Sequence, residues 1–130
     1  MFSYEGGRNR AMLARNFTSN GASHGDDTAY LFDMSMFRDT PPREDDQRII
    51  DALTVMWTNF AKYGDPTPSV SDVTPVKWHP ADRNRRPYLN IDKQITLESR
   101  VFHERMAFWD IYYKMFANKM RGYKTVIGSE

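Results

Sequence analysis

Between residues 43 and 63, hydrophobic side chains recur at steps of three and four positions, the spacing that forms one apolar face of an α-helix. Thr40, a cap-type residue, and two prolines precede this segment, and Gly64 with Pro66 follows it. Acidic residues fill its first turn, where the helix dipole favours negative charge. We therefore predict a helix over 43–63 with these core residues: Ile49, Ile50, Leu53, Met56, Trp57, Phe60 and Ala61. A platform on which a ligand stacks is the alternative for Trp57 and Phe60.

A second helix is predicted over 99–120, and it is apolar almost all round. Its apolar residues are Val101, Phe102, Met106, Phe108, Trp109, Ile111, Tyr112, Tyr113, Met115 and Phe116. Such a helix packs against more than one neighbour, and the 98 residues before it offer too little apolar surface for this. We therefore expect the chain to be part of a larger body. The alternative is an amphipathic helix for a membrane or a partner, but its basic residues form no single polar face.

Short strands are predicted at three places. Residues 1–5 alternate, with Phe2 and Tyr4 on one face, before two glycines interrupt the pattern. Residues 88–91 and 95–97 flank a turn and predict a small hairpin. The segment 65–87 is rich in proline and small polar residues, which predicts a surface excursion, anchored by Trp78.

The candidate chemistry lies in a polar loop over 8–25 that carries His24 among small residues. Gly21 and Gly25 allow the backbone to bend sharply around the imidazole, so that one ring nitrogen can be exposed to a reaction. Asp26 and Asp27 follow and can tune or orient it. A short helical turn is expected from Asp27 to about Met34, with Tyr30, Leu31 and Phe32 packing inward.

Residues 21–25 also satisfy the pattern G-x-S-x-G of a nucleophile elbow, with Ser23 as the serine. An elbow needs an apolar strand running directly into the first glycine and a helix directly after it. Residues 17–20 are turn formers, so we reject Ser23 as a nucleophile. A complete triad within this chain would also need His103 as base, and that residue is better explained as a surface histidine on the last helix.

Six segments, in order along the chain, resemble the type-B carboxylesterases, the α/β-hydrolase family that includes insect α-esterases, juvenile hormone esterases and cholinesterases. These segments are Phe2–Tyr4, Ala22–Asp27 with Tyr30–Phe32, Met56–Pro66, Trp78–Pro80, Tyr88–Ile91 and Arg105–Trp109. The resemblance implies an α/β fold in which residues 1–130 form the C-terminal part of the domain, mainly helical with short strands when taken alone. In that family the order is serine, acid, histidine, so the nucleophile and acid portions would lie outside this chain.

The resemblance also assigns roles. His24 would be the catalytic base of a cofactor-free serine hydrolase of small carboxylic esters, and the remainder of the parent domain would be its partner. Gly25 would leave room for the imidazole and the acyl group. Asp26 and Asp27 are candidates for supporting the histidine, and Asp27 resembles the acidic residue that follows it in the family. Capping of the short helix by these carboxylates is the alternative.

The composition of the chain limits the kinds of partner that we expect for the protein. The 18 lysines and arginines nearly balance 17 aspartates and glutamates and are interspersed, so nucleic acid is an unexpected partner. His79 has no second histidine or cysteine at ligand spacing, so we expect no metal site. We also expect no transmembrane span, because no apolar run approaches about 20 residues. The end of the chain is not a KDEL-type sequence, which disfavours retention in the lumen of the endoplasmic reticulum by that route. The lack of cysteine does not decide between a cytoplasmic and a secreted location.

Two other function classes remain at this point. One is a non-catalytic relative of the esterases that serves in binding or adhesion, against which the retained histidine argues. The other is an independent interaction module that uses the apolar helix at 99–120 to bind a partner. The ester substrate is not defined, because the residues expected to line its pockets lie outside this chain.

Overall fold

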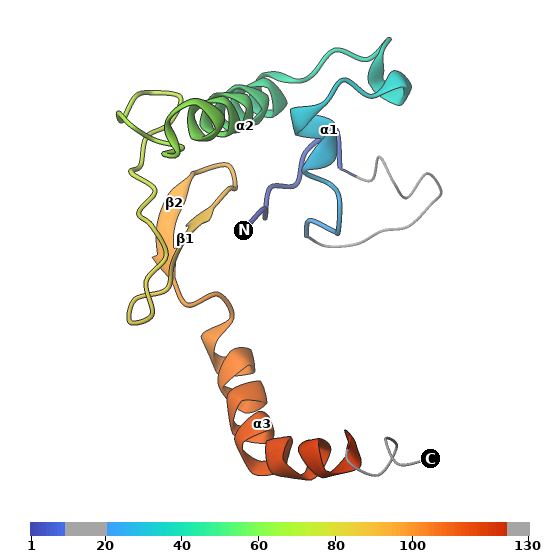
Figure 1. The fold of residues 1–130 in the computed structure, drawn as a ribbon. Helices are drawn as coiled ribbons and strands as arrows, with labels where there is room; N and C mark the ends of the chain where they lie inside the picture. Colours follow the sequence, from blue (N-terminus) through green and yellow to red (C-terminus); the bar gives the residue numbers. More distant parts are fainter. Residues whose placement is uncertain (10–20, 125–130) are drawn as a thin grey trace. The chain divides into compact units, whose positions relative to one another are not determined.

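The computed structural model describes residues 1–9 and 21–124, with side chains up to residue 117. It divides into two units, Met1–Ser99 and Arg100–Glu130. The elements, shown in Figure 1, are α1 (Thr28–Leu31), the 3₁₀ helix η1 (Ser35–Phe37), α2 (Glu44–Tyr63), β1 (Pro87–Asn90), β2 (Thr96–Ser99) and α3 (His103–Lys124).

The helix predicted over 43–63 is confirmed as α2. Its N-cap is Arg43, whose backbone is extended, and not Thr40, because a residue that precedes proline is kept out of the helical region. The acidic first turn is present, and Gly64 ends the helix in the left-handed conformation, with φ 67°. Its N–H donates to the carbonyl oxygen of Phe60 at 2.8 Å.

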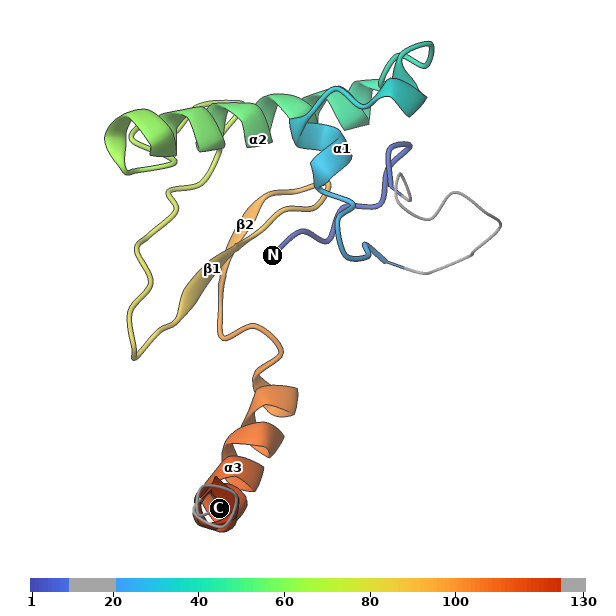
Figure 2. The ribbon, with the colours of Figure 1, turned by 45° about the vertical axis from the view of Figure 1, so that its right-hand side comes forward.

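The core of the first unit forms where α1, the hairpin and the first residues of the chain meet α2. In Figure 2, α1 and the hairpin lie on the same side of α2. The fully buried apolar residues are Tyr4, Tyr30, Ile49, Ala52, Leu53, Met56, Leu89 and Ile91. The predicted apolar face of α2 is therefore confirmed for its first half.

The second half of that face is not buried in this unit. Trp57 and Phe60 are 43% and 62% exposed, and Ala61 is exposed too. Their packing in a core stays a prediction for the larger body to which the chain is expected to belong. Within the described residues, Pro66 and Trp78 line an apolar groove together with Met56, Trp57 and Phe60. Phe32 is also exposed rather than packed inward, because α1 ends at Leu31 and the backbone becomes extended at Phe32.

The predicted hairpin is confirmed as β1 paired antiparallel with β2, with Leu89 opposite Leu97. Residues 1–5, in contrast, form no regular strand among the described residues and make a single parallel bridge between Phe2 and Ile91. The N–H groups of Ser3 and Tyr4 donate to the carbonyl oxygen of Ile91 at 2.9 and 3.0 Å. The pairing stops there because the chain turns at the following glycines, yet it brings Tyr4 into the core.

The excursion from 65 to 87 is anchored by Trp78, as predicted, since this side chain packs against the core. The buried residue Thr67 also anchors this segment. The Thr67 side chain is fully buried, and its hydroxyl oxygen accepts a hydrogen bond from the N–H of Trp78 at 2.7 Å. Lys77 donates to the carbonyl oxygen of Thr67 at 2.6 Å and pairs with Asp65 at 2.5 Å.

In the described part of the second unit, the one element is α3. It begins at His103 and not at Ser99, because Arg100 and Phe102 have positive φ angles that a right-handed helix cannot include. Every side chain from 102 to 115 is exposed, and the neighbours expected for this helix stay a prediction. None of the described helices is long and apolar enough to cross a membrane.

Candidate functional site

His24 stands on a turn that enters α1, and its side chain is exposed. The two glycines near it have positive φ angles, 104° at Gly21 and 83° at Gly25, a region that side chains with a Cβ rarely occupy. The expected sharp bend around the imidazole is thus confirmed. The N–H of Asp26 donates to the carbonyl oxygen of Ser23 at 3.2 Å, which closes the backbone around His24.

Asp26 holds this turn from the inside. Asp26 is 1% exposed. Its Oδ2 accepts hydrogen bonds from the N–H of Ser23 at 2.7 Å and from the Ser23 hydroxyl at 2.9 Å. A third donor is the amide nitrogen of Asn9, at 3.2 Å. A buried carboxylate needs such donors, so Asp26 fixes the residue directly before His24.

Asp27 occupies the N-cap position of α1 but makes no side-chain hydrogen bond to the helix. Capping of α1 by the Asp27 carboxylate is therefore not observed. Asp27 is half-buried and lies directly after the carboxylate that does hold the turn.

The hydroxyl of Ser23 donates to a carboxylate and not to an imidazole. Residues 24–27 form a turn before the four-residue α1, so no helix follows directly after Ser23, as a nucleophile elbow would require. The turn formers predicted at 17–20 lie outside the described residues. The geometry after the serine supports the rejection of this motif.

Asn9 was missed by the sequence analysis. Its Oδ1 accepts from the N–H of Gly6 at 2.8 Å and from the Tyr30 hydroxyl at 2.7 Å. Its Nδ2 donates to the carbonyl oxygen of Tyr4 at 2.8 Å, in addition to Asp26. The only sequence signal is an asparagine two positions after a pair of glycines, which is typical of any turn.

A second buried carboxylate, Asp46 in the first turn of α2, lies behind this site. It accepts hydrogen bonds from the Tyr4 hydroxyl at 3.1 Å, from the N–H of Gly7 at 3.0 Å and from Nε of Arg43 at 2.9 Å. Burial by itself raises the pKa of Asp46, but the hydrogen bonds from Arg43, Gly7 and Tyr4 outweigh it and the pKa is lowered. Burial, with the hydrogen bond to Asp46, raises the pKa of Tyr4 to about 12.

Gly6 is required where this network is most crowded. A Cβ at this position would lie 2.2 Å from Oδ1 of Asp46, 2.3 Å from the Tyr4 ring and 2.4 Å from the Tyr30 hydroxyl. The absence of a side chain therefore lets the chain pass between the two tyrosines and reach Asn9.

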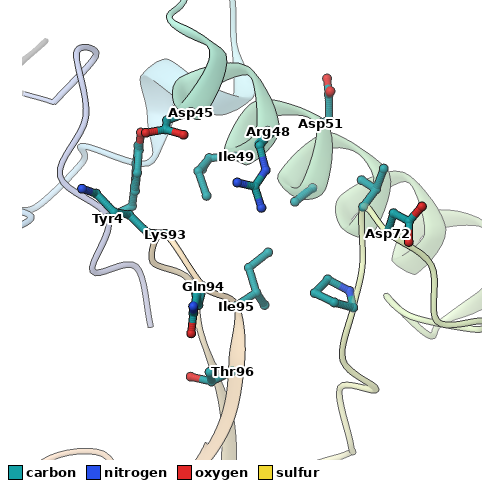
Figure 3. Close-up of a pocket in the computed structure, with 13 residues that line it drawn as sticks. Tyr4, Asp45, Arg48, Ile49, Asp51, Asp72, Lys93, Gln94, Ile95 and Thr96 are labelled. Atoms are coloured by element: carbon teal, nitrogen blue, oxygen red, sulfur yellow. The ribbon is translucent and has the colours of Figure 1, made fainter.

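A further cleft of the first unit lies away from the His24 turn. It has a volume of about 520 Å³ and lies between α2 and the turn of the hairpin, as Figure 3 shows. Arg48 projects from α2 toward Ile95 on the hairpin side. The charged residues that line this cleft are Asp45, Arg48, Asp51, Asp72 and Lys93. His24 is not among the residues that line the cleft.

The two other histidines, His79 in the excursion and His103 at the start of α3, are exposed. Among the described residues, no group of three histidine, cysteine, aspartate or glutamate side chains is arranged to hold a metal ion. Only His24 combines exposure with a turn that is fixed from the inside by a buried carboxylate.

A sequence model of the Carboxylesterase family matches residues 1–109 of the chain, a range that includes the His24 turn, α2 and the hairpin. The chain belongs to the carboxylesterase family. Membership implies an α/β-hydrolase fold, and the helices and two-stranded sheet of the described residues are consistent with one part of it.

The relatives of this carboxylesterase segment include mammalian lipases. It is 37% identical over 98 residues to the bile salt-activated lipase of Rattus norvegicus, covering 73% of this chain and 16% of the relative. The bile salt-activated lipases of Bos taurus and Homo sapiens are 35% and 34% identical, over 72% of this chain and 16% and 13% of their own lengths. The chain thus spans about a sixth or less of the length of these relatives.

Proposed function

We propose that this segment is the C-terminal part of a serine hydrolase of carboxylic esters and supplies the catalytic histidine, His24. The observation that carries the proposal is the His24 turn: the imidazole is exposed, while the backbone beneath it is tied to the buried carboxylate of Asp26. A general base has to be accessible to the nucleophile and held in place at the same time. Family membership and the lipase relatives support ester hydrolysis as the chemistry.

In this proposal His24 first accepts a proton as a general base and then donates it as a general acid. As the nucleophilic serine, supplied by another part of the domain, bonds to the ester carbonyl carbon, an imidazole nitrogen of His24 takes the serine proton. The imidazolium then gives that proton to the alcohol oxygen as its bond to the acyl carbon breaks. A water molecule releases the acyl group by the same two transfers. The second ring nitrogen of His24 is oriented by an acid that also lies in another part of the domain.

Gly25 and the acidic pair have separate roles in this proposal. Gly25 keeps the face beside the imidazole free of a side chain and provides the positive φ of the turn. Asp26 holds the backbone before His24. Asp27 supports the histidine from the half-buried side of the turn.

The kind of ester is a narrower question. The relatives are named as lipases that bile salts activate, and carboxylic esters are the substrate class we propose here. An affiliation with insect α-esterases, juvenile hormone esterases or cholinesterases stays a prediction. A non-catalytic binding protein of the same family is the second candidate, but the exposed histidine on its fixed turn favours the enzyme.

The test uses the complete protein that contains this segment, with His24→Ala beside His79→Ala. Both histidines are exposed, so the second variant is a matched control. We expect hydrolysis of a simple aryl ester to fall about 10⁴-fold or more in His24→Ala, as for the loss of a triad member, and to stay within twofold in His79→Ala. Turnover by His24→Ala within tenfold of wild type would show that His24 is not the base.

A further inference from the structure

The side-chain amide of Asn9 joins the His24 turn to the rest of the first unit by hydrogen bonds. Its two acceptor positions take the N–H of Gly6 and the hydroxyl of Tyr30, and its two donor positions go to the carbonyl oxygen of Tyr4 and to Asp26. An asparagine amide has two N–H donors and two lone pairs on its oxygen, so these four bonds use its full capacity. Few other side chains can make this set of contacts.

The four partners of Asn9 come from both sides of the His24 turn. Tyr4 and Gly6 belong to the segment that pairs with Ile91 beside the hairpin, and Tyr30 belongs to α1, which follows the turn. Asp26 lies in the turn itself. Asn9 therefore fixes the position of the Asp26 carboxylate relative to the buried core.

Asp26 transmits this position to His24. Its Oδ2 accepts from Asn9 and also from the N–H and the hydroxyl of Ser23, the residue directly before the histidine. If the Asn9 bond is lost, a carboxylate that is 1% exposed loses one of its donors and the turn can shift. A shift of about 1 Å in a catalytic group reduces turnover by up to about 10²-fold, even when the altered residue is far from the chemistry.

We propose that Asn9 is a positioning residue for the catalytic base, acting on His24 through Asp26 and Ser23. This inference rests on the proposed function of His24. It assigns to the residues before the turn a role in catalysis besides their role in packing.

The chain offers a matched control for testing it. Asn90 in β1 is also partly buried, and its Nδ2 donates to a carboxylate, that of Glu98, at 3.0 Å. Its Oδ1 accepts a hydrogen bond from the hydroxyl of Ser3 at 2.7 Å. Asn9→Asp and Asn90→Asp therefore make the same chemical change, since each replaces an amide donor with an oxygen that faces a carboxylate.

The experiment compares these two variants in the complete protein by steady-state ester hydrolysis from pH 5 to pH 8, with thermal unfolding measured in parallel. At pH 8 we expect Asn9→Asp to lower kcat about 10- to 100-fold with KM within twofold, because the base is misplaced while the substrate pockets are intact. Asn90→Asp should keep kcat within threefold at a comparable loss of thermal stability. The kcat of Asn9→Asp relative to wild type should recover as the pH falls, because the introduced carboxyl, once protonated, again donates to Asp26.

A second pair, Asn9→Ser and Asn90→Ser, avoids the repulsion between two carboxylates and is measured alongside. If Asn9→Asp does not fold, this second pair decides whether Asn9 positions the base. We expect a loss of about tenfold in kcat for Asn9→Ser only. Equal kcat values for the two members of each pair, with His24→Ala inactive, would overturn the positioning role of Asn9 and leave the proposed function intact. Wild-type turnover by His24→Ala would overturn both.

Discussion

The hydroxyl of Tyr4 donates a hydrogen bond to the carboxylate of Asp46 at 3.1 Å, although 42 positions separate the two residues in the sequence. This bond connects the segment that precedes the His24 turn with the first turn of α2. Asp46 also accepts from the N–H of Gly7 and from Arg43. The support of the candidate site therefore depends on a buried charge.

Asp46 should make the protein sensitive to acid. Its pKa is lowered in the folded state, so the unfolded chain binds a proton more readily, and the stabilisation is present above the unfolded pKa of about 3.9. It is lost as the pH falls from there through the lower folded pKa. In the complete protein that contains this segment, we expect Asp46→Asn to unfold at lower temperature at pH 7 and to show a smaller further decrease in Tm between pH 5 and pH 3 than wild type.

The control for that measurement is Asp51→Asn, because Asp51 is an exposed carboxylate on the same helix. It should follow the wild-type pH dependence. Equal changes in Tm for Asp46→Asn and wild type over the acid range would contradict the role given to this carboxylate.

Ser23 should not react as a nucleophile. Its hydroxyl is held by the Asp26 carboxylate, and no helix follows it directly. We expect the 130-residue chain by itself to form no covalent adduct with a fluorophosphonate probe, as measured by intact mass. Stoichiometric labelling that disappears in Ser23→Ala would show that the G-x-S-x-G pattern is a real elbow.

The isolated chain should not form a cooperative native state. Burial of one large apolar side chain contributes ~1.5–3 kcal/mol, against a net stability of about 5–15 kcal/mol for a domain. Phe60, Phe108 and Trp109 are 62%, 62% and 49% exposed, and most of the apolar side chains of α3 share this exposure. We expect a helical circular dichroism spectrum, binding of a hydrophobic dye and no sharp thermal transition.

The same measurement distinguishes the function classes. A monomer with a cooperative melt and well-dispersed amide resonances would favour the independent interaction module, in which α3 is a binding element. Loose packing favours the reading in which other parts of a larger domain cover α2 and α3.

Features that depend on neighbours along the chain could be predicted from the amino-acid sequence. The three- and four-residue spacing from Ile49 to Met56, with Gly64 at the end, was sufficient to predict α2, and alternation around a short turn predicted the hairpin. The glycines on either side of His24 predicted its bend, since only glycine adopts the positive φ angles of this turn at little cost.

Which distant residues meet became visible only in the folded chain. The bonds that join Asn9 to Tyr30, and Tyr4 to Asp46, span 21 and 42 positions and leave no periodic trace in the sequence, because polar contacts of this kind depend on how the segments pack. For the same reason the hydrophobic pattern of α2 could not show that Trp57 and Phe60 are exposed. Whether an apolar face is covered depends on the segments that reach it, and within the described residues only Pro66 and Trp78 line the groove beside these two side chains with Met56.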